Sequence, residues 1–218
     1  MKQPIWTFRI GDVLPSSDPL ARFVTVVGAA FNDLVFINGL LVRPDVVTSE
    51  GEQQYLLRTA TAHLWEFSLT LKQWKAHASV LPLIDGLDRD LRDDLEAVLC
   101  IADPGEDPVL KTIAHLRNAA TWHYASPNKP KWIEKALAES ADHEGSIQFG
   151  ATMGGIRVGF ADEIILQFAV QLFPGGDDEA DLAAFRLLLQ QVAELMTAAI
   201  RVSHGILVAF FKDRSDAV

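Results

Sequence analysis

The sequence is poor in cysteine and in basic residues, and each shortage excludes a class of protein. Cys100 is the only cysteine among 218 residues, so no disulfide can form within the chain, which is compatible with a reducing cytosol. Lys and Arg number 19 against 29 Asp and Glu, which gives a formal net charge of -10. A non-specific nucleic-acid coat protein needs basic surface to displace counterions, so this balance argues against one but permits a local basic pocket.

Apolar runs free of charge are missing as well. Residues 20–42 and 182–211 are apolar enough to raise the question of a membrane span, but charged residues such as Arg22 and Arg201 interrupt them. A spanning helix needs roughly 20 residues with few or no charges. No apolar h-region follows Lys2, as a signal peptide would require. We therefore expect core helices in a cytoplasmic protein that does not associate with membranes.

The motifs of metal, nucleotide and hydrolase sites are also missing. No two of the six histidines stand at i,i+4 spacing, and none has a cysteine partner. The acidic run 85–94 lacks the central glycine and terminal glutamate of a calcium loop. Gly154, Gly155 and Gly159 follow no phosphate-binding pattern, and no Gly-x-Ser-x-Gly elbow occurs. We expect neither a metal ion nor a cofactor.

What the chain contains is apolar residues at helical spacing, and 49% of it is hydrophobic. Asp18 and Pro19 predict the N-cap and first residue of a long helix that Pro44 ends. A second long helix is expected over about 49–77. The apolar stripes of these two helices are Leu20, Phe23, Val27, Phe31, Leu34 and Leu41, and then Leu57, Ala60, Leu64, Phe67, Leu71 and Trp74.

Shorter elements complete the predicted fold. Cys100 falls in an apolar helical stretch and is expected to be an inert core thiol. Alternating apolar residues around Gly154 and Gly155 predict a β-hairpin. The expected elements are a strand at 5–10, a connector at 81–86, helices at 88–101, 107–124 and 131–140, the hairpin at 145–160, and a last helix at 178–213.

Together these elements predict a mainly α protein. The simplest architecture is a single domain over residues 1–218, an up-down bundle of five to six helices with the hairpin inserted before the last long helix. Val208, Phe210 and Phe211 lie off the main stripe of that last helix. Such surplus apolar surface would be buried in a homodimer.

One helical run concentrates polar chemistry: Arg117-Asn118-Ala119-Ala120-Thr121-Trp122-His123-Tyr124. Arginine offers a fixed fork of donors for phosphate, and histidine exchanges protons near neutral pH. The pair could cleave RNA without a metal, His123 deprotonating the ribose 2′-hydroxyl and Arg117 holding the charge that develops on phosphorus. Tyr124 could position a phosphate. On an ideal helix, however, His123 lies roughly 120° around the axis from Arg117.

This run resembles the signature of the HEPN superfamily, an arginine followed by a polar residue with a histidine four to six residues on. The resemblance implies a dimeric bundle of four or five helices with the motif on a late helix near the dimer axis. It implies Arg117 and His123 as the active pair of a metal-independent endoribonuclease from a toxin–antitoxin or other defence system, with Asn118 as polar companion and an antitoxin as partner. Tyr124 matches only some family members, and the hairpin departs from the minimal fold.

Other interpretations of the same residues stay open. Arg117 and Asn118 could bridge helices while His123 and Tyr124 are hydrogen-bonded core or edge residues. The chain would then be a non-catalytic helical dimer that binds a protein or nucleotide partner, or a structural dimer with no site. Secondary candidates lie on the second long helix, where ion pairing or solvation is the favoured interpretation of Arg58, His63 and Glu66. Trp65, Trp74, Trp122 and Trp132 are expected in the core or at the dimer contact.

Overall fold

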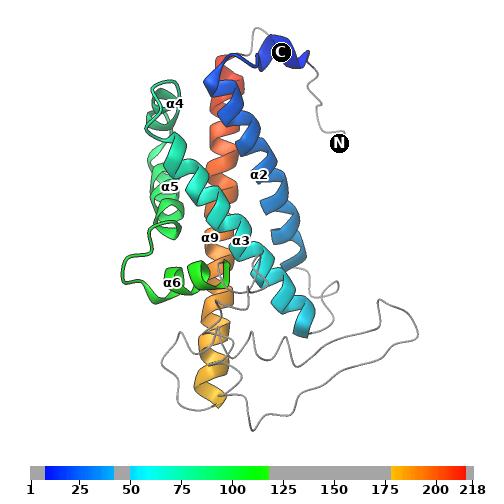
Figure 1. The fold of residues 1–218 in the computed structure, drawn as a ribbon, viewed down its shortest axis with the longest axis vertical. Helices are drawn as coiled ribbons and strands as arrows, with labels where there is room; N and C mark the ends of the chain where they lie inside the picture. The colour runs from blue at the N-terminus through cyan, green and yellow to red at the C-terminus, as the bar shows by residue number, and fades with distance from the viewer. Residues whose placement is uncertain (1–7, 42–49, 118–177, 215–218) are drawn as a thin grey trace, which may run out of the picture. The chain divides into compact units, whose positions relative to one another are not determined.

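The computed structural model describes residues 8–41, 50–117 and 178–214, and this part of the chain is helical with no strand (Figure 1). The prediction of a mainly α protein is confirmed. The helices are α1 (Ile10–Val13), α2 (Pro19–Leu41), α3 (Glu50–Trp74), α4 (Leu81–Asp85), α5 (Arg89–Ile101), α6 (Pro108–His115) and α9 (Asp178–Asp213).

Local capping chemistry sets where two of these helices begin. At the start of α2, the backbone N–H of Leu20 donates to Asp18 Oδ1 at 2.9 Å, and Pro19 is the first helical residue. At the start of α5, the N–H of Leu91 donates to Asp88 Oδ1 at 2.9 Å. A carboxylate at this position satisfies backbone donors that have no partner within the helix. The predicted cap of α2 is therefore confirmed.

The chain divides into two compact units, and three helices contribute residues to both. The first unit contains Met1–Phe36, His63–Asp103 and Leu195–Val218, and the second contains Ile37–Ala62 and Pro104–Glu194. The first unit thus holds α1, α4, α5 and parts of α2, α3 and α9, whereas the second holds α6 with the remaining parts of those three.

Within the first unit, α2 packs antiparallel to α9. Arg214 Nη2 lies 3.0 Å from Asp18 Oδ2, and further along both helices the rings of Phe31 and His204 have centroids 6.3 Å apart. The residue numbers rise on α2 as they fall on α9, which defines the antiparallel direction (Figure 1). The contacts of α2 with α3, Phe23 with Trp74 and Asp33 with His63, run in the same antiparallel sense.

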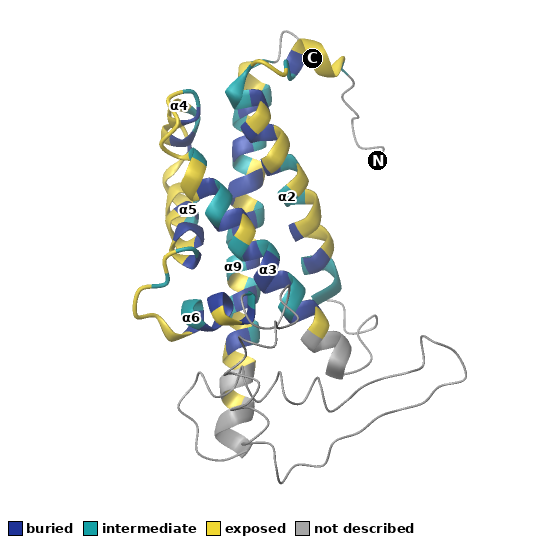
Figure 2. Cartoon of the chain, viewed as in Figure 1, coloured by how far each residue is buried: buried dark blue, intermediate teal, exposed yellow. Residues whose placement is uncertain are grey.

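The apolar stripe predicted for α3 is buried except at its end, whereas only Phe23, Val27 and Leu34 of the stripe predicted for α2 are buried. On α3, Leu57, Ala60, Leu64, Phe67 and Leu71 are all buried, with none more than 3% exposed. Because residues three and four apart share one helix face, these five positions turn a single side of α3 inward, and the sixth, Trp74, is half-buried. Figure 2 shows buried positions interleaved with exposed ones along each helix, as one-sided packing requires.

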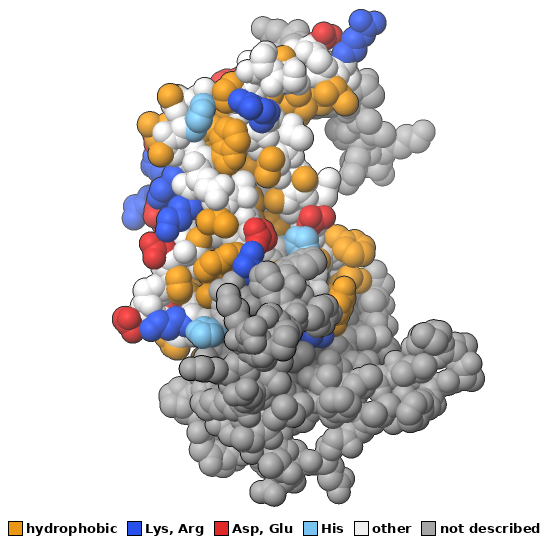
Figure 3. All heavy atoms as spheres, in the orientation of Figure 1, with side chains coloured by type: hydrophobic (Ala, Val, Ile, Leu, Met, Phe, Trp, Pro, Cys, Tyr) orange, Lys and Arg blue, Asp and Glu red, His pale blue; other side chains and the backbone are white. Residues whose placement is uncertain are grey.

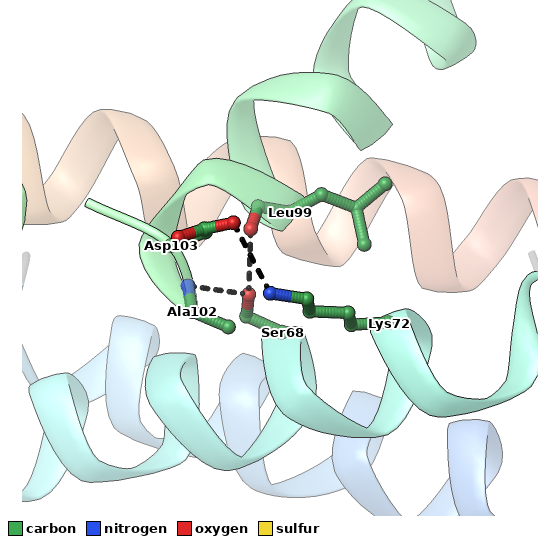
Figure 4. A network of polar contacts seen from close by, with 5 residues as sticks. All are labelled: Ser68, Lys72, Leu99, Ala102 and Asp103. Atoms are coloured by element: carbon green, nitrogen blue, oxygen red, sulfur yellow. Dashed lines mark hydrogen bonds and ion pairs between the residues drawn. The ribbon is translucent and has the colours of Figure 1, made fainter. Parts of the chain in front are cut away.

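A buried serine joins α3 to the end of α5 (Figure 4). Ser68 Oγ donates to the carbonyl of Leu99 at 3.4 Å and accepts from the backbone N–H of Ala102 at 3.0 Å. Lys72, one turn further along α3, forms an ion pair with Asp103, Nζ to Oδ2, at 3.2 Å. Ser68 therefore satisfies backbone groups at the end of α5 that the helix itself cannot satisfy.

Two predictions about short segments of the chain differ from the structure. A strand was expected at 5–10; residues 5–7 lie outside the described residues, and residues 8–10 form no strand, since α1 begins at Ile10. Residues 81–86 were expected to be a connector, but Leu81–Asp85 form α4, with Pro82 in its first turn. Proline is compatible with the first turn of a helix because its missing N–H has no partner there.

Two predictions about burial were also wrong. Cys100 is exposed rather than buried, because α5 turns its buried residues Leu95, Val98 and Leu99 to the other side. Phe210 is fully buried, and Phe211 is half-buried against Phe8 and Phe210 with ring centroids 5.5 and 5.3 Å away. Of the apolar surplus expected on the last helix, only Val208 is largely exposed, at 49%.

Several predicted elements lie outside the described residues. They are the end of the helix expected at 107–124, the helix at 131–140 and the hairpin at 145–160, together with Trp122 and Trp132. The last helix, α9, is confirmed with the predicted bounds of 178 and 213. Trp65 is half-buried, and Trp74 is half-buried between Phe23 and His77, with centroids 5.8 and 5.5 Å away.

Candidate functional site

The helix that leads to Arg117 is α6, and its beginning is strongly capped. Asp107 Oδ1 accepts hydrogen bonds from the backbone N–H groups of Val109 and Leu110 at 2.8 and 3.0 Å, and Pro108 is the first helical residue. Thr112 is buried, and its hydroxyl donates to the carbonyl of Pro108 at 2.7 Å. These contacts fix the first turn of a helix only eight residues long.

An ion pair flanks this capped start. Lys111 Nζ donates to Glu106 Oε2 at 2.7 Å. The hydrogen bond from Lys111 and its positive charge lower the pKa of the Glu106 carboxyl below its ordinary value. The carboxylate of Glu106 is exposed, so this pair is screened by water and adds little to the stability of α6.

Arg117 lies where α6 gives way to a wider turn. Residues 116 and 117 follow α6 with π-type winding. Leu116 is 1% exposed, whereas Arg117 is half-buried. Single π-type turns are frequent at functional sites. Arg117 is therefore a half-buried residue directly after α6, next in sequence to the fully buried Leu116 of the second unit.

The rest of the predicted site lies outside the described residues. Asn118, His123 and Tyr124 all lie in the segment 118–177, which is not among the described residues. The expected separation of Arg117 and His123 around one helix therefore stays a prediction.

The secondary candidates on α3 fall into different units. Arg58 is half-buried and belongs with Arg117 to the second unit, whereas His63 and Glu66 belong to the first. His63 Nδ1 lies 3.6 Å from Asp33 Oδ2 on α2, with side chains 31% and 58% exposed. This separation exceeds a hydrogen bond, so the contact is an ion pair only when the imidazole is protonated.

Asp33 contacts the secondary candidate His63, and the sequence patterns did not identify Asp33 as a site residue. It lies 30 positions before His63, and the two meet because α2 and α3 are antiparallel within the first unit. No local spacing signals such a pair. The Asp33–His63 pair could have been predicted only from knowledge that α2 and α3 pack against each other in the antiparallel direction.

Among the described residues, no three His, Cys, Asp or Glu side chains are grouped to hold a metal ion. Two described segments are long and apolar enough to cross a membrane by length and composition, Pro19–Leu41 and Arg186–Asp213. One third of the first window and 39% of the second are buried within the protein. Buried core helices of this length pass the same test, so length and apolar character do not distinguish a membrane-spanning helix from a buried core helix.

Comparison with protein-family models, with curated proteins and with solved structures found no significant match to this chain.

Proposed function

We propose that this chain is a HEPN-like helical protein that cleaves RNA without a metal ion, with Arg117 and His123 as the active pair. The proposal includes a cytoplasmic homodimer, an up-down bundle with a hairpin at 145–160, and an antitoxin as partner. One observation carries it: Arg117 follows a firmly capped helix, in a π-type turn where its side chain is half-buried. A guanidinium with reduced access to water binds phosphate oxygens more strongly than a fully solvated one.

The proposed reaction is an internal transesterification of RNA. His123 takes the proton of a ribose 2′-hydroxyl, whose oxygen then bonds to the adjacent phosphorus. The bond from phosphorus to the 5′-oxygen breaks, and this oxygen takes a proton from water while the proton on His123 returns to water, so that no net proton is gained or lost. Arg117 balances the negative charge that develops on the phosphate oxygens. Asn118 and Tyr124 would hold the neighbouring phosphate. The products are a 2′,3′-cyclic phosphate and a 5′-hydroxyl end.

Cleavage of a labelled RNA of mixed sequence by the full-length chain tests the proposal, with a metal chelator present throughout. We expect cyclic-phosphate ends from the wild type and a rate lower by about 10²–10⁴ for His123→Ala, since general bases contribute on that order. Arg117→Ala should lose cleavage as well. His77→Ala is the matched control, because His77 is exposed on the turn after α3. Equal rates for the wild type and His123→Ala would remove the catalytic role.

A second candidate is a non-catalytic helical dimer that binds a protein or nucleotide. The formal charge of -10 favours it, because a polyanion such as RNA is repelled by an acidic protein. In this case the wild type leaves the RNA intact, and Arg117 serves only to bridge helices or hold a partner. Growth inhibition by the wild type, relieved by His123→Ala in a stably folded chain, would favour the ribonuclease over this alternative.

A further inference from the structure

The exposed face of α2 carries a stripe of five residues that nothing in the described part of the chain covers. Val26 is 43% exposed and Phe36 69%, and Arg22, Ala29 and Asp33 are exposed as well. All five belong to the first unit. In the space-filling view, hydrophobic side chains reach the surface over α2 beside acidic and basic ones (Figure 3). The stripe is therefore apolar at its middle and at one end, and charged at two positions.

The spacing of this stripe is that of a helix-pairing seam. Successive members are four, three, four and three residues apart, an average of 3.5. By helix geometry all five lie within roughly 40° of Arg22 around the axis. A repeat of 3.5 keeps a seam facing one partner helix along its whole length, which an ordinary solvated face does not require. Val35, which is also exposed, lies off this seam.

The stripe is complementary to itself in the antiparallel direction. The midpoint between Val26 and Ala29 is also the midpoint between Arg22 and Asp33. A two-fold axis through that point places Arg22 opposite Asp33 of a second copy, twice, and Val26 opposite Ala29, twice. The same operation brings Phe36 opposite Pro19. A two-fold interface requires this kind of self-complementarity, with unlike charges facing each other.

We propose that α2 pairs antiparallel with α2 of a second copy of this chain, along the seam formed by Arg22, Val26, Ala29, Asp33 and Phe36. Ala29 at the centre lets the two helices approach closely, as small residues do at helix crossings. Arg22 forms no ion pair with another described residue and is available to a partner. Asp33 is 58% exposed even with His63 beside it, so one carboxylate oxygen can accept from Arg22 of the second copy.

A second copy fits this face better than lipid does. Although α2 is long and apolar enough to span a membrane, Arg22 and Asp33 lie on its exposed side rather than against the core. Charged side chains facing hydrocarbon cost several kcal/mol each, whereas opposite charges across a two-fold interface attract. This interface does not depend on RNA cleavage and would persist if Arg117 and His123 prove inactive.

Charge reversal tests the pairing, with dimer dissociation measured by sedimentation of the full chain over a wide concentration range. One helix pair is small beside a standard interface of about 1,600 Å², so we expect a dissociation constant in the micromolar range for the wild type. Arg22→Glu and Asp33→Arg each place like charges opposite one another twice, and each should raise that constant roughly tenfold or more. The double variant restores unlike pairs and should return it towards the wild-type value.

Controls separate this interface from other causes. Arg89→Glu reverses a charge on the exposed face of α5, where Arg89 is 88% exposed, and should leave dimerisation unchanged. Ala29→Glu, which puts like charges beside the two-fold axis, replaces Asp33→Arg if that variant unfolds by circular dichroism. A wild type that stays monomeric at every concentration overturns the proposal, as does a double variant no better paired than the single ones. Flotation of the wild type with phosphatidylcholine–phosphatidylglycerol vesicles, unaffected by Arg22→Glu, would assign the face to lipid instead.

Discussion

Gly205 on α9 lies so close to Leu91 on α5 that any side chain at position 205 must displace it. A Cβ at Gly205 would stand 2.5 Å from Leu91 Cδ1, well inside van der Waals contact. Gly28 on α2 is different, because a Cβ there would meet only Leu207 Cδ2 at 3.9 Å. A side chain at position 205 would therefore force the half-buried Leu91 side chain to move, whereas one at position 28 would not disturb its neighbour.

Substitution of these two glycines should therefore give opposite results. Gly28→Ala should raise the free energy of unfolding by about 0.5–1 kcal/mol, the helix-propensity gain of alanine over glycine. Gly205→Ala has the same gain but must push Leu91 aside, so it should be about 1–2 kcal/mol less stable than Gly28→Ala. Gly205→Val should lower the free energy of unfolding below that of the wild type by about 1–3 kcal/mol.

Urea denaturation followed by circular dichroism measures all three variants. Leu91→Ala combined with Gly205→Ala is the control, since removing the Leu91 side chain should abolish the penalty at position 205. An equal gain for the two alanine variants would show that the Leu91 side chain moves aside without cost and would contradict the predicted penalty at position 205.

The bond pattern of Ser68 makes a second prediction. Ser68→Ala should lower the free energy of unfolding by about 1–3 kcal/mol, because it leaves the Ala102 N–H and the Leu99 carbonyl at the end of α5 without their partner. Ser203→Ala is the matched control. Ser203 is equally buried, but its hydroxyl donates to the carbonyl of Ala199, four residues back along the same helix. Ala199 lies within α9, so its carbonyl can still accept from a backbone N–H four residues further along the helix when the serine hydroxyl is removed. Ser203→Ala should therefore change the free energy of unfolding by under about 0.5 kcal/mol. Comparable losses in the two variants would contradict a special role for Ser68.

Much of the first unit could be predicted because the signals are local. The Asp18 cap of α2 depends on atoms two residues apart, and the stripe through Leu64 and Leu71 depends only on helical periodicity. Cys100 was mispredicted because apolar neighbours in sequence do not share a helix face, and α5 turns Leu99 inward and Cys100 outward.

What could not be predicted depends on how helices pair. The meeting of Asp33 with His63 requires the antiparallel register of α2 and α3, which no short motif encodes. The same holds for the closeness of Gly205 to Leu91. At the candidate site, Arg117 is placed by the cap and winding of α6, both local features, whereas its relation to His123 is a question of tertiary arrangement.

The Glu106–Lys111 pair predicts a pH dependence of one carboxyl group. Lys111 lowers the pKa of Glu106, so Lys111→Met should raise that pKa to its ordinary range, as followed by the carboxyl carbon shift in an NMR titration. A carboxyl with a lowered pKa stabilises the fold at pH above its unfolded pKa, and this contribution is lost as the pH falls through its folded pKa. Because Glu106 is fully exposed, the stability lost should be too small to move the urea midpoint at neutral pH. Lys212→Met, on the last turn of α9, is the control and should leave the Glu106 titration unchanged.

The Asp18 carboxylate makes two separate contacts, and different substitutions remove either one of them or both. Its Oδ1 caps α2 by accepting from the Leu20 N–H, while its Oδ2 accepts from Arg214 Nη2 at 3.0 Å. Arg214 also lies over the Phe210 ring, with its guanidinium carbon 3.9 Å from the centroid. Asp18→Asn keeps a capping oxygen but loses the charge, and should lower the free energy of unfolding by about 0.5–1 kcal/mol, in the range of a partly exposed ion pair.

Asp18→Ala loses the cap as well, so it should be about 1 kcal/mol less stable than Asp18→Asn. Arg214→Ala removes the same ion pair and the contact with Phe210, which adds roughly 0.5–1 kcal/mol to the loss. Urea denaturation at low and at high salt separates the contributions, because salt screens the ion pair and leaves the cap intact. Asp18→Asn should therefore approach the wild type at high salt while Asp18→Ala does not. If the difference in stability between Asp18→Asn and Asp18→Ala changes with salt, the cap and the ion pair of Asp18 are not independent.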